Sequence, residues 1–264
     1  MLPKQMVMRI SVITPVLNKA AYIERCLLSM DQQSYNNFEH IIIDGGSQDG
    51  TVELIKHYAS TRPNVTWVSK PDRGQSHAMN RGLRLAKGEI IGFLNADDYY
   101  EPEILTSVSS EFQDMRRPSI LFGKCVIWND MSEIWGVHEP KLIDIVEWLL
   151  PAGDKLIPVN PVQYFCSADV HLLVGDFDED EHYVMDMDFL FRAIQVANHR
   201  SVDRVFGNFR LISGTKTLSD IQASTADARF LQLRHKYIAS LPLRMRLTYE
   251  SKRIARKLPY FSNR

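Results

Sequence analysis

The feature that most constrains the fold is an alternation, over roughly the first hundred residues, between short apolar runs and segments of helical periodicity. Strands are predicted at 10–14, 40–44, 65–69 and 89–95. Helices are predicted between them at 20–33, 51–60 and 75–86. Isoleucines 41 to 43 follow one another without a polar break, as expected of a parallel strand covered on both faces. Strand–helix–strand order of this kind implies right-handed crossovers and an open α/β sheet.

Polar side chains stand where each predicted strand ends. They are Asn18 after the first strand, Asp44 at the end of the second, Asp72 after the third, and Asn95, Asp97 and Asp98 after the fourth. In open α/β sheets, ligands bind beyond the carboxyl ends of the strands. Four polar strand ends on one edge of one sheet therefore predict a single site.

The rest of the chain is less regular. A strand is predicted at 119–128, and helices at 142–150 and 189–196. Between these two helices lie a proline-rich loop and an acidic run that extends from Asp176 to Asp188. The sequence contains no internal repeat and no low-complexity tract.

The composition excludes several classes of protein. A formal net charge of −1 argues against a polycation that binds nucleic acid. No apolar stretch approaches the roughly 20 residues that span a bilayer, and the segment before the first strand lacks the apolar core of a signal peptide. Cys26, Cys125 and Cys166 are far apart, which suits a reducing compartment better than a zinc site. We therefore expect a cytoplasmic protein.

Asp44 and the two glycines that follow it predict a ligand contact. Glycines at this position let the backbone approach a ligand closely, and the Asp44 carboxylate can accept a hydrogen bond from a base imide or a ribose hydroxyl. The alternative is an Asx turn that holds the loop. Ser47 and Asp49 are predicted to cap the next helix. The spacing does not match a dinucleotide fingerprint, and the sequence contains no P-loop motif.

The string Asn95-Ala96-Asp97-Asp98 predicts a cation site. Neighbouring oxygen ligands at a strand end suit a hard cation such as Mg²⁺ or Mn²⁺, which takes few protein ligands and fills the others with phosphate oxygens. The alternative is a turn that caps a helix beginning near Pro102.

The acidic run 176–188 combines a turn with the start of a helix. It is not a calcium-binding EF-hand, because Glu181 and Met187 stand where that motif requires Gly and Glu. The acids from Asp176 to Glu181 are predicted to form a solvated turn. Asp188 is expected to pair with Arg192 one helical turn later. Asp186 then remains as a candidate general base, with helix capping as the alternative.

Five strings, taken in order, resemble the family 2 glycosyltransferases of the GT-A fold. They are Val12-Ile13-Thr14-Pro15-Val16-Leu17-Asn18, Ile43-Asp44-Gly45-Gly46-Ser47-Gln48-Asp49-Gly50-Thr51, Pro71-Asp72-Arg73-Gly74, Ala78-Met79-Asn80-Arg81-Gly82 and Phe93-Leu94-Asn95-Ala96-Asp97-Asp98. They cover residues 9 to about 102, and looser matches follow at 175–179 and 185–192. The resemblance implies transfer of a sugar from a nucleotide-diphosphate sugar, most simply a UDP-sugar, to a hydroxyl acceptor in polysaccharide or glycolipid synthesis.

The resemblance also implies roles for individual residues. Those expected at the nucleotide are Pro15, Val16, Leu17, Asp44, Asp72 and Arg73. Asn95-Ala96-Asp97 is similar to the family's D-x-D motif, with Asp97 as the main ligand of Mg²⁺ or Mn²⁺ and Asn95 as a neutral ligand. Asp186 matches the base that activates the acceptor in inverting enzymes, where one in-line displacement passes through an oxocarbenium-like transition state.

The chain departs from the family pattern at three positions. Asn95 replaces the first acid of D-x-D, Gly45 replaces a second acid after Asp44, and Ile212 stands where many relatives have a histidine. These departures leave open the alternative that the chain is a degenerate relative of the family, which binds nucleotide or scaffolds a complex without turnover. A sugar nucleotidyltransferase is disfavoured, because the loop after the first strand is not glycine-rich.

The resemblance predicts an organisation in two parts. Residues 1–218 would form the GT-A domain, an open, mixed but mostly parallel sheet flanked by helices, with a nucleotide-binding half at 1–102 and an acceptor half at 103–218. Residues 219–264 would form a basic helical extension. Between Arg229 and Arg264 the sequence has ten Lys or Arg and one acid, Glu250. We expect this segment either to contact the inner face of an anionic membrane, where a lipid-linked saccharide acceptor would reside, or to be an ordinary solvated helix.

Overall fold

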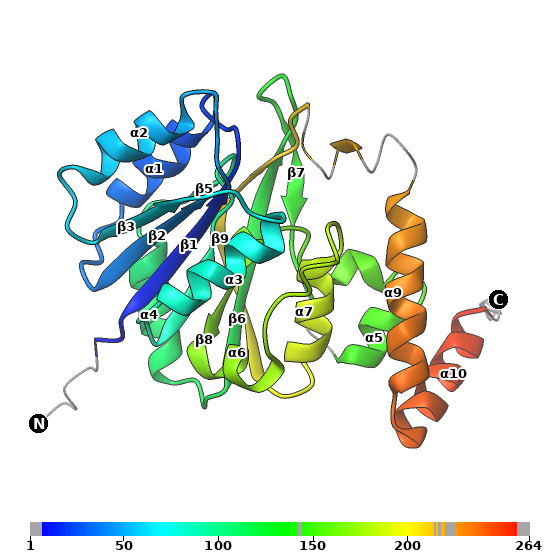
Figure 1. The fold of residues 1–264 in the computed structure, drawn as a ribbon. Coiled ribbons are helices and arrows are strands. Elements are labelled where there is room, and N and C mark those ends of the chain that lie inside the picture. Colours follow the sequence, from blue (N-terminus) through cyan, green and yellow to red (C-terminus); the bar gives the residue numbers. More distant parts are fainter. Residues whose placement is uncertain (1–6, 142–143, 214, 216–217, 220–224, 258–264) are drawn as a thin grey trace, which may run out of the picture.

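The computed structural model describes residues 7–141, 144–213, 215, 218–219 and 225–257. Its centre is a sheet with helices on both faces, and two C-terminal helices stand beside it (Figure 1). The sheet of the described residues has nine strands in the order β3-β2-β1-β4-β8-β6-β9-β5, with β7 paired to β6. The mixed α/β architecture predicted from the sequence is confirmed.

The first half of the chain forms the parallel part of the sheet. Its strands are β1 (Ile10–Val16), β2 (Phe38–Asp44), β3 (Val65–Ser69) and β4 (Ile90–Phe93). The helices between them are α1 (Ile23–Asp31), α2 (Thr51–Ala59) and α3 (Gln75–Leu85). The carboxyl ends of β1 and β2 are level, because Val16 pairs with Asp44. All seven predicted elements are present, although α1 begins at Ile23 because residues 20–22 form a turn.

The three consecutive isoleucines of β2 are explained by helices on both faces of the sheet. Ile41 and Ile43 belong to the core cluster that contains Met79 of α3. Ile42 belongs to another cluster, with residues of α1 and α2. Successive side chains of a strand point to opposite faces, so a strand covered on both faces needs an apolar residue at every position.

The second half of the chain completes the sheet with mixed pairing. Its strands are β5 (Tyr99–Tyr100), β6 (Ser119–Trp128), β7 (Ile134–His138), β8 (Tyr164–Ser167) and β9 (Asn198–Arg210). Its helices are α4 (Ile104–Gln113), α5 (Ile145–Leu149), α6 (Ala168–Val174) and α7 (Met185–Ala193), with short 3₁₀ helices η1 (Gly153–Leu156) and η2 (Pro161–Gln163). Strand β8 lies antiparallel between β4 and β6, which joins the two halves in one sheet.

Two helix predictions need correction. The helix predicted at 142–150 is the short α5, which Asp144 begins by accepting a hydrogen bond from the Glu147 backbone N–H; residues 142–143 lie outside the described residues. The helix predicted at 189–196 begins at Met185 and ends at Ala193. Asp186 and Asp188 therefore lie in the first turn of α7, where the helix dipole favours negative charge.

The C-terminal segment forms helices α9 (Ala226–Ser240) and α10 (Leu243–Lys257). Leu233 and Tyr237 of α9, and Leu241 at its C-cap, are buried in the core cluster that also contains residues of β1 and α7. Figure 1 shows α9 alongside α5 and α7, with α10 farther out. Helix α9 therefore packs on the sheet domain, and a division of the chain at residue 218 stays a prediction. None of the described helices is long and apolar enough to cross a membrane.

Candidate active site

A cavity of about 550 Å³ lies where the predicted strand ends meet. Its lining comes from the ends of β1 and β9, the loops after β3 and β4, the segment 159–161, the start of α7 and the first turns of α9. Of the residues predicted for the site, seven line this cavity: Pro15, Val16, Leu17, Asp72, Asn95, Asp97 and Asp186. The other two, Asp44 and Arg73, do not belong to its lining.

Asp44 is fully buried and serves its own loop. Its carboxylate accepts hydrogen bonds from the backbone N–H groups of Gly46 and Ser47, at 2.9 and 3.0 Å, and from the Ser69 hydroxyl at 2.6 Å. The Ser47 hydroxyl also donates to it. This arrangement is the Asx turn that was the alternative to a ligand contact. A contact between Asp44 and the nucleotide stays a prediction.

The helix-capping prediction is wrong for Ser47, whereas Asp49 accepts a hydrogen bond from the Thr51 backbone N–H, the first of α2. The residue at the N-cap of α2 is Gly50, with φ of 96°, and it makes no side-chain cap hydrogen bond. Ser47 instead accepts a hydrogen bond from the Asn18 backbone N–H at 2.7 Å, which ties the loop after β2 to the loop after β1. Asp49 accepts from the backbone N–H groups of Thr51 and Ala20, so it bridges the same two loops.

Asp72 explains the glycine at position 45. A Cβ atom on Gly45 would lie 2.7 Å from Oδ2 of Asp72, closer than van der Waals contact allows. Asp72 also accepts a hydrogen bond from the Gly74 backbone N–H at 2.9 Å, which holds the loop that leads into α3. The Arg73 side chain is 74% exposed and pairs with Glu179, and it does not line the cavity.

The string 95–98 places three polar side chains in three different environments. Asp97 Oδ2 accepts from Lys19 Nζ at 2.7 Å, and both side chains line the cavity. Asn95 Oδ1 accepts from the Gln75 amide at 2.9 Å. Asp98 is buried and turned inward, where it accepts from the Asn95 and Asn160 amides and the Arg210 backbone N–H. Burial, and then the charge of Asp97, raise the pKa of the Asp98 carboxyl.

The oxygens at this strand end suit a hard cation that takes only a few ligands from the protein. Among the residues that the structure describes, no three His, Cys, Asp or Glu gather in a group that could hold a metal ion alone. Asp97 offers a carboxylate in the cavity wall, and the neighbouring ammonium of Lys19 shows that this wall already stabilises one positive charge. The donor set therefore fits Mg²⁺ or Mn²⁺ only when phosphate oxygens complete the coordination.

Asp186 is held at the cavity in the first turn of α7. Its Oδ1 accepts from the Met187 backbone N–H at 2.8 Å. The N-cap of α7 is Val184, without a side-chain cap, so the structure does not bear out the capping alternative for Asp186. Burial is the main cause that raises the pKa of the Asp186 carboxyl from 3.8 to about 6, and the charge of Glu181 adds to it. Such a carboxylate is a stronger base than an ordinary aspartate and is still ionised at neutral pH.

Asp188, two residues later, has a structural function. Its carboxylate pairs with Arg192, as predicted, at 3.0 Å, and also with Lys236 of α9 at 3.0 Å. The Tyr237 hydroxyl donates a third hydrogen bond to it at 3.0 Å. These partners hold the pKa of Asp188 below its ordinary value despite burial.

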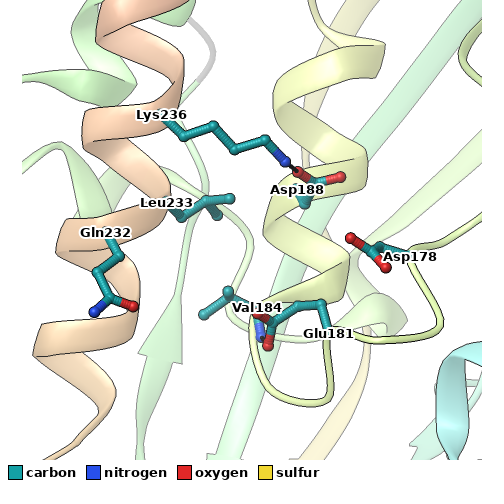
Figure 2. Close-up of a pocket in the computed structure, with 7 residues that line it drawn as sticks. All are labelled: Asp178, Glu181, Val184, Asp188, Gln232, Leu233 and Lys236. Atoms are coloured by element: carbon teal, nitrogen blue, oxygen red, sulfur yellow. Dashed lines mark hydrogen bonds and ion pairs between the residues drawn. The ribbon is translucent and has the colours of Figure 1, made fainter.

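The ion pair between Lys236 and Asp188 spans a smaller cavity of about 190 Å³ between α7 and α9 (Figure 2). Gln232 and Leu233 face this gap from α9, while Asp178 and Glu181 face it from the loop before α7. Because this gap belongs to the packing of the two helices, we assign it no ligand.

Sequence reasoning missed several residues of the main cavity. Those with side chains able to contact a ligand are Lys19, Gln75, His182, Tyr183, Arg210, Asp227 and Phe230. Lys19 follows a predicted strand end and could have been found from that position. Asp227 and Phe230 carry no local signal, because they reach the cavity only through the packing of α9.

Comparisons with known proteins agree with this geometry. The sequence profile of glycosyl transferase family 2 matches residues 11–156. The chain is 38% identical over 212 residues to a chondroitin synthase of Pasteurella multocida, a match that covers 79% of this chain and 21% of that enzyme. This chain thus corresponds to about a fifth of the synthase's length.

Solved structures of glycosyltransferases share the fold. TarS of S. aureus, in complex with UDP-GlcNAc, has a TM-score of 0.66 at 20% identity over 80% of this chain and 61% of that one. The mannosyltransferase PcManGT of Pyrobaculum calidifontis, in complex with GDP-Man and Mn²⁺, has a TM-score of 0.58 at 18% identity over 96% of this chain and 82% of that one. With the profile match extending over more than half of its residues, the chain belongs to glycosyltransferase family 2.

Proposed function

We propose that this chain transfers a sugar from a UDP-sugar to a hydroxyl group of a saccharide acceptor, with inversion at the anomeric carbon. The observation that carries the proposal is that one cavity is lined by the ends of the parallel strands, by Asp97 and by Asp186. A nucleotide, a diphosphate and an acceptor hydroxyl can therefore be held within a single space. The solved TarS complex with UDP-GlcNAc supports a UDP-sugar as the donor.

We place the nucleoside against the backbone and side chains of Pro15, Val16 and Leu17 at the end of β1. Asp72 lines the same cavity and can accept a hydrogen bond from the nucleoside. Arg73 and Asp44, which the family resemblance also assigns to this pocket, would support it through the loops that they hold.

The diphosphate is proposed to lie at the end of β4, near Lys19 and Asp97. Asp97 would hold Mg²⁺ or Mn²⁺, with the Asn95 amide oxygen as a weaker ligand once it leaves Gln75. The solved PcManGT complex contains Mn²⁺ and supports this assignment. When bound, such an ion stabilises the negative charge that develops on the departing diphosphate. Lys19 supplies a second positive charge at the same place.

Asp186 would act as the general base. Its carboxylate takes the proton of the acceptor hydroxyl while the acceptor oxygen forms a bond to the anomeric carbon. The bond from that carbon to the phosphate oxygen breaks in the same step, and UDP leaves with the electron pair. A carboxyl with a pKa of about 6 is mostly ionised at pH 7 and is better matched to this proton transfer than a solvated aspartate.

The product is proposed to be a surface polysaccharide or glycolipid, as the chondroitin synthase relative suggests. A membrane contact would then involve α10 rather than the whole basic segment. Leu243, Leu247 and Ile254 share one face of α10 and are 72%, 62% and 56% exposed. By contrast, Lys252 and Arg256 are engaged by Glu147 of α5.

The membrane contact is tested by sedimentation with vesicles. The double variant Leu243→Glu/Leu247→Glu should bind less to phosphatidylglycerol vesicles than the unaltered chain, and neither should bind phosphatidylcholine vesicles. Leu172→Glu is the matched control, because Leu172 is 86% exposed on α6. Equal binding of the double variant and the unaltered chain would remove the membrane contact from the proposal.

The transferase activity is tested by release of the nucleoside diphosphate from a panel of UDP-, dTDP- and GDP-sugars, with Mn²⁺, with Mg²⁺ and with EDTA. We expect turnover with a UDP-sugar that EDTA abolishes. Asp97→Ala and Asp186→Ala should each abolish it, whereas a scaffold that only binds nucleotide would show no turnover to lose.

A further inference from the structure

The first turns of α9 form part of the wall of the main cavity. Asp227 and Phe230 line it together with Tyr183 and Asp186. Helix α9 lies outside the region matched by the family profile, which ends at residue 156. This part of the wall is therefore built by a segment that the family motifs do not include.

Helix α9 is fixed relative to the helix that carries Asp186. Tyr237 and Lys236 both bind the carboxylate of Asp188, in the same turn of α7 as Asp186. Leu233 and Tyr237 are buried, and the Phe230 ring packs 6.3 Å from the Phe191 ring. Because these contacts join the two helices, Asp227 and Phe230 keep a defined position beside the candidate base.

The side chains on this wall have the chemistry that recognises a sugar ring. A pyranose has an apolar face of C–H groups and a rim of hydroxyls. The ring of Phe230 offers a flat apolar surface with a negative π face, which attracts C–H groups. The Asp227 carboxylate is exposed and can accept hydrogen bonds from hydroxyls. A largely apolar surface with a few polar groups is the usual composition of a small-molecule site.

Tyr183 and Arg229 add a second surface at the same place. The Arg229 guanidinium lies 3.8 Å from the centroid of the Tyr183 ring, so the α9 helix and the loop before α7 are joined at the cavity. Tyr183 is 41% exposed and lines the cavity. The wall formed by Asp227, Phe230 and Tyr183 is hereafter the α9 subsite.

We propose that the α9 subsite binds the terminal sugar ring of the acceptor, with Phe230 against the apolar face of the ring and Asp227 accepting hydrogen bonds from its hydroxyls. This assignment rests on the proposed transferase function. It makes α9 a determinant of acceptor specificity.

The experiment compares donor and acceptor steps in Asp227→Asn and Phe230→Leu. The acceptor probes are p-nitrophenyl glycosides of glucose, galactose, N-acetylglucosamine, N-acetylgalactosamine and glucuronic acid. Transfer from the preferred UDP-sugar gives the acceptor KM, saturation-transfer NMR in the presence of UDP reports glycoside binding, and calorimetry gives the Kd of UDP. Leu231→Ala is the matched control, because Leu231 lies on α9 but does not line the cavity.

Each variant is expected to raise the acceptor KM about 10-fold, the usual effect of losing one hydrogen bond or one apolar contact in a site. The Kd of UDP should change less than about 2-fold, which is small on the same scale. The control should match the unaltered chain in both. An unchanged acceptor KM, an equal loss of UDP affinity, or the absence of glycoside saturation with the unaltered chain would each overturn the subsite. Failure of the unaltered chain to release UDP from any donor would instead refute the proposed function.

Discussion

Replacing Asp186 by Asn should inactivate the protein and stabilise it at the same time. Asn keeps the shape of the side chain and can still accept the hydrogen bond from the Met187 backbone N–H. It removes the basic oxygen, however, and with it the burial of a charge. A catalytic base should therefore be distinguishable from a residue that merely holds α7 in place.

The magnitude of the stabilisation follows from the raised pKa. The difference between 3.8 and about 6 corresponds to about 3 kcal/mol at pH 7, and because Asp186 is only partly buried by exposed area, solvent reduces this to about 1–2 kcal/mol. A carboxyl whose pKa is higher in the folded state holds its proton more tightly there. Its contribution to the free energy of unfolding is complete below about pH 4 and is lost as the pH rises through about 6.

Two measurements check this prediction. Urea unfolding at pH 4 and pH 7 should show Asp186→Asn more stable than the unaltered chain at pH 7 and equal to it at pH 4. Release of UDP should show kcat lowered by a factor of about 10² to 10⁴, the usual contribution of a general base. In the unaltered chain kcat should rise with pH and level off above an inflection near pH 6. A destabilised variant, or one that keeps kcat within about 10-fold of the unaltered chain, would refute the reasoning.

Three further changes test neighbouring interactions. Glu181→Gln removes a negative charge that raises the pKa of Asp186, so the inflection in the pH profile of kcat should move to lower pH. An unchanged profile would show that the charge of Glu181 does not affect the ionisation of Asp186. Lys19→Met removes the cation that pairs with Asp97, so Mn²⁺ no longer competes with an ammonium group for this carboxylate. The concentration of Mn²⁺ needed for half-maximal UDP binding, measured by calorimetry, should therefore fall by about 3-fold to 10-fold. An unchanged or higher concentration would show that Lys19 does not compete with the ion. Asp188→Asn leaves Arg192 and Lys236 without their anionic partner. The free energy of unfolding, measured in urea, should therefore fall by about 1–3 kcal/mol. An unchanged value would mean that α9 is held by its apolar contacts alone.

The parallel half of the sheet and its site edge were predictable from the sequence. Periodicity identifies elements whose faces are uniformly covered, and the run Ile41 to Ile43 needed no knowledge of the partners that cover it. Pairing of Val16 with Asp44 then brings the strand ends level, as expected for parallel strands joined by helices. Of the polar side chains predicted to meet at this edge, Asp72, Asn95 and Asp97 line the cavity, whereas Asn18, Asp44 and Asp98 do not.

The antiparallel insertion of β8 was not predictable. Residues 164–167 are only four apolar or small residues after a loop, and nothing local specifies that they pair with β4 on one side and β6 on the other. Likewise, two of the three hydrogen-bond donors to Asp98, Asn160 and Arg210, are distant in sequence. Long-range pairing depends on the summed packing of both halves, which a local window does not contain.

The amino-acid sequence by itself determined the α/β class, the edge of the sheet at which the site forms and the family. All three depend on local periodicity and on motifs at short spacing. Only the tertiary structure decided which aspartates stabilise the fold and which line the cavity. Asp44 is enclosed by its own loop, Asp98 is turned inward, Asp188 anchors α9, and Asp97 and Asp186 face the cavity. The side chains are chemically identical, so burial and the distant groups beside each carboxylate separate their functions.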